Sequence, residues 1–223
     1  NDIVDRDFDK KVQRTKKRPI ASGKISISHS FLYVVILCAF ALLILLQFNF
    51  LTIILGMSSM ILAFTYPFMK RFTYWPQLFL GLTFNWGIIM GWASITNNIS
   101  IEPIVLYCSA IFWTLGYDTI YGLQDIKDDE IIGIKSTSIK FKNNVKTFVG
   151  TSYCLCILFI LILTYLMEID KYLMTLSILF ILSLIYQVTI FKANNPRSCL
   201  TAFKSNNLTG IFIFIFILSF TTS

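Results

Sequence analysis

The sequence is poor in charge and almost without histidine. Charged residues make up 14% of the 223 residues, compared with about 25% in a typical soluble protein. His29 is the one histidine, so no Ser/His/Asp or Cys/His constellation for nucleophilic catalysis is possible. The five cysteines lack zinc-ligand spacing with a histidine, and no glycine-rich phosphate loop is present. These absences argue against a hydrolase, a nucleotide-binding protein and a zinc protein.

Long apolar runs take the place of the missing charge. Hydrophobic residues make up 56% of the chain, and phenylalanine alone occurs 21 times. A bilayer core is crossed by about 20 apolar residues in a helix, because each backbone amide in lipid must be bonded within its own segment. The sequence therefore predicts an all-α, polytopic transmembrane bundle. Its seven expected spans are residues 29–48, 51–69, 77–96, 102–122, 146–167, 172–191 and 207–222.

The positive charges follow the loops that these spans define. When the loops are sorted alternately to two sides, all of the 19 lysines and arginines except Lys171 fall on one side or at the start of a span that leaves it. That side holds residues 1–28, 70–76, 123–145 and 192–206. The positive-inside rule makes it the cytoplasmic or matrix side. Topology thus explains the net charge of +7, and we expect no nucleic-acid partner.

Acidic residues gather in two short segments on this same side. Four of the 12 acids lie in residues 1–9 and five lie in residues 118–130. In the first segment, Asn1, Asp5 and Asp9 recur every four residues, so on a helix they share one face.

The second acidic segment shows a similar spacing. Asp125 and Asp129 are four residues apart, and Asp118 precedes Asp125 by seven residues. On a continuous helix these three side chains also share a face. Asp118 lies inside an expected span, so we expect it to face protein or a wet cavity and not lipid.

Carboxylates crowded on one helix face repel one another, and folding does not require such a stripe. Mg²⁺ removes the conflict, because it takes a few carboxylate ligands and leaves positions for water and substrate phosphates. The sharper hypothesis is that two acidic helix ends converge on a diphosphate through Mg²⁺. The alternative is that they are solvated loop acids that balance nearby lysines.

Basic residues close to the acids fit the first hypothesis. Arg14 and Arg18 follow the first acidic segment, and Lys70 lies in a short loop on the same side. Arginine and lysine at these places are candidates for gripping diphosphate oxygens. Membrane topology alone is enough to explain why Lys16, Lys17 and the lysines after residue 133 lie on this side.

An allylic diphosphate ionises to a carbocation once its leaving group is neutralised, and aromatic faces stabilise such a cation. Six aromatic residues on the expected spans are candidates to line the cavity: Tyr66, Trp86, Trp92, Trp113, Tyr117 and Tyr121.

Three motifs in order then resemble a known family. They are N-D-x-x-D-x-x-x-D with R-T-x-x-R-P-I-A-S-G in residues 1–23, Y-P-x-x-K-R-x-T with P-Q and L-G in 66–81, and Y-D-T-I-Y, Q-D-x-x-D-D and G-x-K-S-T in 117–137. Together they resemble the UbiA superfamily of intramembrane prenyltransferases. The resemblance covers nearly the whole chain and is closest to the branch that prenylates 4-hydroxybenzoate in ubiquinone biosynthesis.

The resemblance implies nine transmembrane helices around a central cavity with a lateral opening. Residues 1–223 would then form one transmembrane prenyltransferase domain that lacks its first helix and most of its second, and we expect this piece alone to be inactive. Carried over by motif position, the Mg²⁺ ligands are Asn1, Asp5, Asp9, Asp125 and Asp129. The diphosphate-binding residues are Arg14, Arg18 and Lys70, and the catalytic residues are Asp118, Lys70 and Tyr66.

The expected substrates are a polyprenyl diphosphate and 4-hydroxybenzoate. The expected place is a bacterial or mitochondrial inner membrane, with the active site on the cytoplasmic or matrix face. Two alternatives stay open at this point. One is a sister prenyltransferase with haem, naphthoate or homogentisate as acceptor, and the other is a cation transporter. The sequence leaves the prenyl length and the oligomeric state open.

Overall fold

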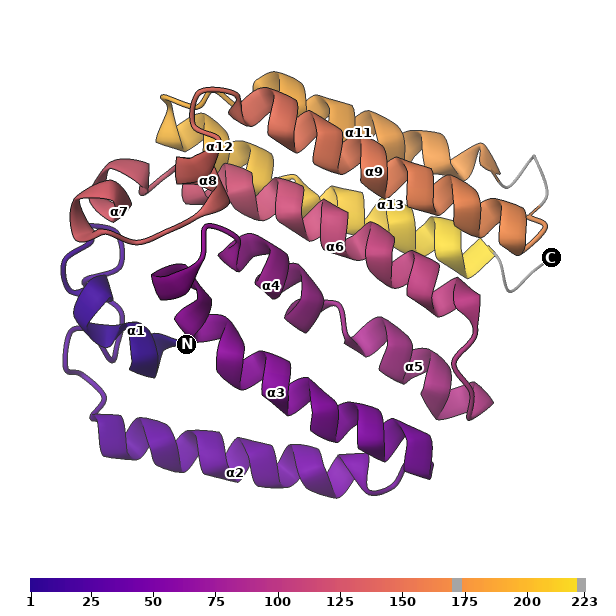
Figure 1. Cartoon of the computed structure of the whole chain (residues 1–223), viewed down its shortest axis with the longest axis horizontal. Helices are drawn as coiled ribbons and strands as arrows, with labels where there is room; N and C mark the ends of the chain where they lie inside the picture. The colour runs from indigo at the N-terminus through magenta and orange to yellow at the C-terminus, as the bar shows by residue number, and fades with distance from the viewer. Residues whose placement is uncertain (170–173, 220–223) are drawn as a thin grey trace.

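The computed structural model describes residues 1–169 and 174–219, and within these ranges every element of regular structure is a helix. Figure 1 shows the helices running alongside one another along the long axis of the molecule. Their bounds are α1 Asp2–Asp9, α2 Ile27–Leu45, α3 Phe50–Phe72, α4 Pro76–Phe84, α5 Gly87–Thr96, α6 Ile101–Gly122, α7 Ile126–Ile132, α8 Thr137–Lys140, α9 Val145–Leu166, α11 Leu176–Ile190, α12 Pro196–Lys204 and α13 Asn206–Leu218.

The expected all-helical membrane fold is confirmed. Five segments of the described residues are long and apolar enough to cross a bilayer. They are Ile27–Leu45, Phe50–Phe72, Pro76–Thr96, Val145–Leu166 and Pro196–Leu218. The two other expected spans match α6, which has 22 residues but carries two acids, and α11, which has 15 residues. Part of the expected span 172–191 lies outside the described residues, and the count of seven stays a prediction.

The span expected at 77–96 agrees with the candidate span Pro76–Thr96, which consists of two helices, α4 and α5. Between them the Asn85 side-chain amide donates to the Gly81 carbonyl oxygen and to Thr114 Oγ1, each at 2.9 Å. One expected boundary was wrong. Most of the loop expected at 192–206 is helical instead. Pro196 begins α12, and the Asn195 side chain caps its free backbone amides.

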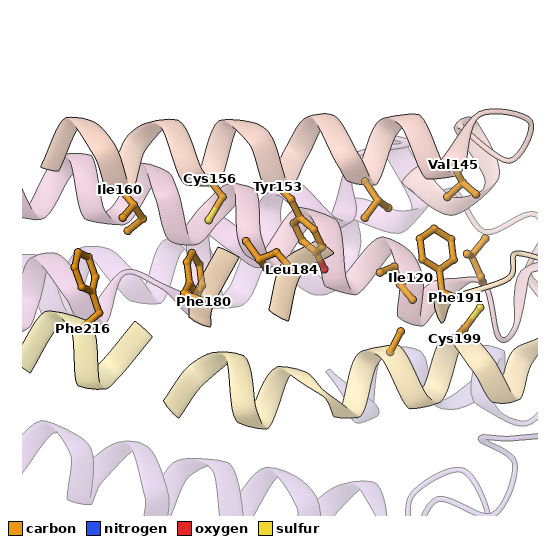
Figure 2. Close-up of a cluster of buried hydrophobic side chains, with 13 residues drawn as sticks. Ile120, Val145, Tyr153, Cys156, Ile160, Phe180, Leu184, Phe191, Cys199 and Phe216 are labelled. Atoms are coloured by element: carbon orange, nitrogen blue, oxygen red, sulfur yellow. The ribbon is translucent and has the colours of Figure 1, made fainter. Parts of the chain in front are cut away.

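The main core lies between α6, α9, α11 and α13. Figure 2 shows Tyr153, Cys156 and Ile160 of α9 directed toward Phe180, Leu184 and Phe216. Helices α6 and α9 pack closely because Gly116 leaves room for the ring of Tyr153. On the opposite edge of the bundle, α2 contacts α3 and leaves most of its apolar side chains exposed, as expected for a helix that faces lipid.

The short helices α1, α7 and α8 gather at one end of the bundle (Figure 1). They belong to the two loop regions that the charge pattern assigned to a single membrane side. The fold therefore brings the two acidic segments, more than a hundred residues apart in sequence, to the same end of the molecule.

Candidate active site

A cavity of about 220 Å³ lies at this end, between α1, the segment after it, α3, α6 and α7. All ten residues that the sequence singled out line it. They are Asn1, Asp5, Asp9, Arg14, Arg18, Tyr66, Lys70, Asp118, Asp125 and Asp129. The structure thus brings the candidate site residues together, while their individual roles stay predictions.

The first wall of the cavity is α1. The helix turns Asp5 and Asp9 inward, where 2% and 7% of these residues are exposed, and turns Asp7 outward. Asp5 Oδ2 pairs with Lys70 Nζ at 2.8 Å. Its other oxygen, Oδ1, is buried and has no hydrogen-bond partner among the described residues. A buried carboxylate oxygen without a hydrogen-bond partner costs folding free energy unless another group, such as a cation, binds it.

Two arginines after α1 hold acids from both segments. Arg18 Nη1 lies 3.0 Å from Asp9 Oδ2 and 3.2 Å from Asp2 Oδ1. Arg14 crosses to the second acidic segment, where Nε lies 2.8 Å from Asp125 Oδ2 and Nη1 donates to the Tyr121 hydroxyl at 2.7 Å. The hydrogen bond with Asp125 raises the pKa of Arg14, so this guanidinium stays charged.

The second acidic segment forms the opposite wall, but not as a single helical face. α6 ends at Gly122, the chain turns, and Asp125 is the N-cap of α7. The expectation that Asp118, Asp125 and Asp129 share one continuous helical face was therefore wrong. They come from different segments and meet at the same cavity, because the turn carries α7 back toward α1.

Burial and the nearby charge of Asp125 raise the pKa of Asp129 to about 6. No ion pair joins this carboxylate to any residue of the described ranges. The Asp118 carboxylate, deeper in the cavity, likewise has no hydrogen bond or ion pair within the described part of the chain. Free carboxylate oxygens thus project into the cavity from both walls.

These residues fit a divalent cation that also binds a substrate phosphate. Within the described residues, no three His, Cys, Asp or Glu side chains lie close enough to hold a metal by themselves. Mg²⁺ does not require such a cage, because it is commonly bound by one or two carboxylates, water and phosphate oxygens. The unpaired Asp5 Oδ1 and the free carboxylate of Asp129 supply hard oxygen donors for such a site.

Sequence reasoning undervalued two residues that line the cavity. Lys135 does so, and its backbone amide donates to the Lys70 carbonyl oxygen at 2.9 Å. Gln77 also lines the cavity, and its Oε1 accepts from the Thr137 amide at 3.0 Å. Both belong to the quoted motifs, P-Q and G-x-K-S-T, so the signal was present in the sequence.

The six aromatic candidates separate into several groups. Tyr66 and Tyr121 line the charged cavity. Trp113 and Tyr117 line a second cavity beside it, and Trp92 lines a third cavity with Glu102. Trp86 donates its indole N–H to the Leu55 carbonyl oxygen at 3.0 Å, which is a structural role.

The sequence profile of the UbiA prenyltransferase family matches residues 1–218. The chain belongs to the UbiA prenyltransferase family. UbiA proteins generally depend on a divalent metal ion, which agrees with the oxygen donors in this cavity. The resemblance noted from the three motifs is thereby confirmed.

Curated relatives share the name of one branch of the UbiA family. The mitochondrial 4-hydroxybenzoate polyprenyltransferase of Bos taurus is 43% identical over 96% of this chain and 58% of its own length. The enzyme of the same name from Homo sapiens is 42% identical over the same shares. That from Rattus norvegicus is 51% identical over 67% of this chain and 40% of its own length. The chain spans about half the length of the curated relatives it matches.

A solved structure agrees with the fold. The apo structure of a UbiA homolog from Aeropyrum pernix K1 aligns with a TM-score of 0.80 over 96% of this chain and 82% of its own. The two sequences are 20% identical, so the likeness concerns the fold alone. The apolar helices and the membership of the UbiA family make this chain an integral membrane protein.

Proposed function

We propose that the protein transfers a polyprenyl group from polyprenyl diphosphate to the ring of 4-hydroxybenzoate, in a Mg²⁺-dependent step of ubiquinone biosynthesis. The observation that carries this proposal is the single cavity lined by acids from two distant segments together with Arg14, Arg18 and Lys70. The names of the relatives favour 4-hydroxybenzoate as the acceptor.

The acids would hold the metal and the basic residues would hold the diphosphate. Asn1, Asp5 and Asp9 would bind Mg²⁺ from one wall, and Asp125 and Asp129 from the other. When bound, the metal neutralises charge on the diphosphate and so improves it as a leaving group. Each cation is now paired with an acid, as Lys70 is with Asp5. The diphosphate oxygens would replace these carboxylates as partners when the acids turn to the metal.

The chemical step breaks the bond between C1 of the prenyl chain and the diphosphate oxygen, and the electron pair leaves with the diphosphate. A ring carbon of the acceptor then bonds to C1 and its proton departs. Lys70 would stabilise the leaving diphosphate, and the Tyr66 ring would face the allylic cation. Asp118 is the free carboxylate beside the reacting centre and would accept the proton.

The proposed location follows from the position of the cavity. It lies at the end of the bundle that carries the lysine- and arginine-rich loops, so the positive-inside rule assigns it to the matrix or cytoplasmic face. The names of the relatives favour the mitochondrial inner membrane over a bacterial one.

The test measures prenylated product in membranes that contain the full-length protein, given 4-hydroxybenzoate and a polyprenyl diphosphate. We expect product with Mg²⁺ and none with a chelator. Asp5→Asn removes the acid with the unpaired oxygen and should abolish turnover. Asp7→Asn is the matched control, since it makes the same change on the same helix at an exposed position and should leave turnover close to wild type.

The outcomes separate the alternatives. A folded wild-type protein that forms no product from 4-hydroxybenzoate, but releases diphosphate with another arene, would reveal a different acceptor. A protein that releases no diphosphate with any acceptor would overturn the prenyltransferase proposal and favour ion transport.

A further inference from the structure

A cluster of three aromatic rings lies at the charged end of the bundle. Trp75, the N-cap residue of α4, packs edge to face against Phe141 and Phe148, with ring centroids 5.7 Å and 6.0 Å away. Phe141 and Phe148 are stacked on each other with their centroids 4.0 Å apart. The three residues are half-buried, so each leaves part of its surface accessible. The charged cavity is lined by other residues.

The place of this cluster along the helices puts it at the surface of the membrane. Trp75 directly precedes the candidate span Pro76–Thr96, and Phe148 lies in the first turn of the span Val145–Leu166. Aromatic residues at the ends of membrane spans commonly lie at the level of the lipid headgroups. The cluster therefore lies where the headgroups of one leaflet would surround it.

Two exposed lysines at this level lack an acid partner. Lys140 Nζ lies 4.6 Å from the centroid of the Trp75 ring. Lys146, in the first turn of α9, has its Nζ 5.6 Å from the centroid of the Phe191 ring. Within the part of the chain that the structure describes, neither ammonium group makes an ion pair or a hydrogen bond.

Two nearby lysines differ, because their ammonium groups are already bonded. Lys142 Nζ pairs with Glu130 at 2.7 Å, and Lys135 Nζ donates to the Phe72 carbonyl oxygen at 3.2 Å. Membrane topology explains why all four lysines lie on this side. It does not explain why two of them rest against aromatic rings without an acid. An unpaired ammonium group at the membrane surface attracts the phosphate of an anionic lipid.

We propose that this surface binds the headgroup of an anionic phospholipid. The residues of this lipid patch are Trp75, Lys140, Phe141, Lys146 and Phe148. The two ammonium groups would pair with phosphate oxygens, and the half-buried rings would contact the upper part of the acyl chains. The contact with the Trp75 ring favours this position of the Lys140 ammonium group, while its carbon chain lies along apolar surface.

The experiment measures lipid binding to the purified full-length protein by native mass spectrometry. Phosphatidylglycerol is compared with phosphatidylcholine that has the same acyl chains, so that the headgroup alone differs. We expect wild type to bind phosphatidylglycerol more tightly than phosphatidylcholine. The double variant Lys140→Gln/Lys146→Gln should bind phosphatidylglycerol roughly 30-fold more weakly, because each lysine near an anionic surface contributes roughly fivefold. Its binding of phosphatidylcholine should not change.

Two further variants act as controls. Lys11→Gln/Lys17→Gln makes the same change in net charge at two exposed lysines of the segment between α1 and α2, and it should bind phosphatidylglycerol as wild type does. Trp75→Leu keeps every charge but removes the ring beside Lys140, so it should weaken binding less than the double lysine variant does. Thermal midpoints without added lipid show whether each variant is folded.

The outcomes decide the proposal without any need for turnover, so they do not depend on the proposed reaction. Equal binding of phosphatidylglycerol by wild type and by the double variant Lys140→Gln/Lys146→Gln would overturn the proposal. An equal loss in Lys11→Gln/Lys17→Gln would also overturn it, because net charge alone would then explain the effect. If inorganic phosphate displaces phosphatidylglycerol from wild type, the patch is a site for free phosphate and the proposal of a lipid site is wrong.

Discussion

Two polar clusters lie between the helices of this protein, and they differ in whether their buried polar atoms have hydrogen-bond partners. In the core, the fully buried Gln187 donates to Asn206 and Thr209 and accepts from the Tyr153 hydroxyl. In the charged cavity, Asp5 is equally buried but has one oxygen without a partner among the described residues. The first cluster satisfies its polar groups, and the second leaves oxygen atoms available.

We infer from this difference that the core cluster serves stability and that the charged cavity serves a ligand. A buried polar group that lacks a hydrogen bond costs about 1–3 kcal/mol, so a cluster that only held helices together would not retain one. The core cluster conforms to this rule. The cavity departs from it where a metal and a diphosphate would supply the missing partners. Substitutions in the core cluster should therefore lower stability, whereas substitutions in the charged cavity should lower activity.

The largest expected effect is on activity and comes from Asp125→Asn in the full-length protein. This change removes a proposed metal ligand and the partner of Arg14. We expect kcat to fall roughly 100-fold or more, since a single preorganised electrostatic group contributes about 10²–10³. The thermal midpoint in detergent should change little. Asp128→Asn changes a half-buried neighbour that does not line the charged cavity, and it should remain close to wild type. Equal losses in both variants would contradict the assignment.

The next effect is on stability and comes from Gly116→Leu. A side chain at Gly116 would overlap the ring of Tyr153, which carries the hydroxyl bonded to Gln187. Such overpacking costs about 1–3 kcal/mol or more, so the thermal midpoint of the purified protein should fall. Gly150→Leu on the neighbouring helix is the matched control, because its added side chain meets open space. Equal midpoints for the two variants would count against close packing of α6 on α9.

A smaller loss of stability is expected from Gln187→Leu. This substitution leaves the Tyr153 hydroxyl without its acceptor and removes the bond that Gln187 donates to Thr209 Oγ1, at a cost of about 1–3 kcal/mol. Thermal unfolding in detergent measures it. Gln47→Leu removes an exposed glutamine that bonds only to its own helix within the described chain, and it should be nearly neutral. If Gln187→Leu reduces kcat without lowering the midpoint, the core cluster has a functional role after all.

The smallest effect concerns pH and Asp129. Its pKa is raised from 3.8 to about 6, so between these values the folded protein holds a proton that the unfolded chain has lost. The contribution of the Asp129 carboxyl to the free energy of unfolding is therefore largest at low pH and declines as the pH rises to about 6. In chelator, Asp129→Asn should be more stable than wild type at pH 7 and equal to it at low pH. Excess Mg²⁺ at pH 7 should remove the advantage, and an advantage that persists would argue against a metal at Asp129.

The candidate site was predictable in composition but not in geometry. Asp5 and Asp9 could be placed on one helical face because α1 is a regular helix whose spacing reads directly from the sequence. The relative positions of Asp118 and Asp129 could not be predicted in this way, because the chain turns between α6 and α7. Helical spacing applies only along a continuous helix. Residues 192–206 were assigned to a loop because they lie between two apolar runs, whereas most of them form α12, which packs against α6.

The sequence by itself determined the membrane-embedded helical class, and it supplied the predicted sidedness of the charges and the candidate site residues. These follow from local properties, namely apolar length, charge and helical spacing, which act within one segment. The tertiary structure decided which acids are paired and which oxygen stays free, and it formed the second cavity from α4, α6, α12 and α13. Those features depend on contacts between segments far apart in the chain, where the packing of side chains fixes distances that no local pattern encodes.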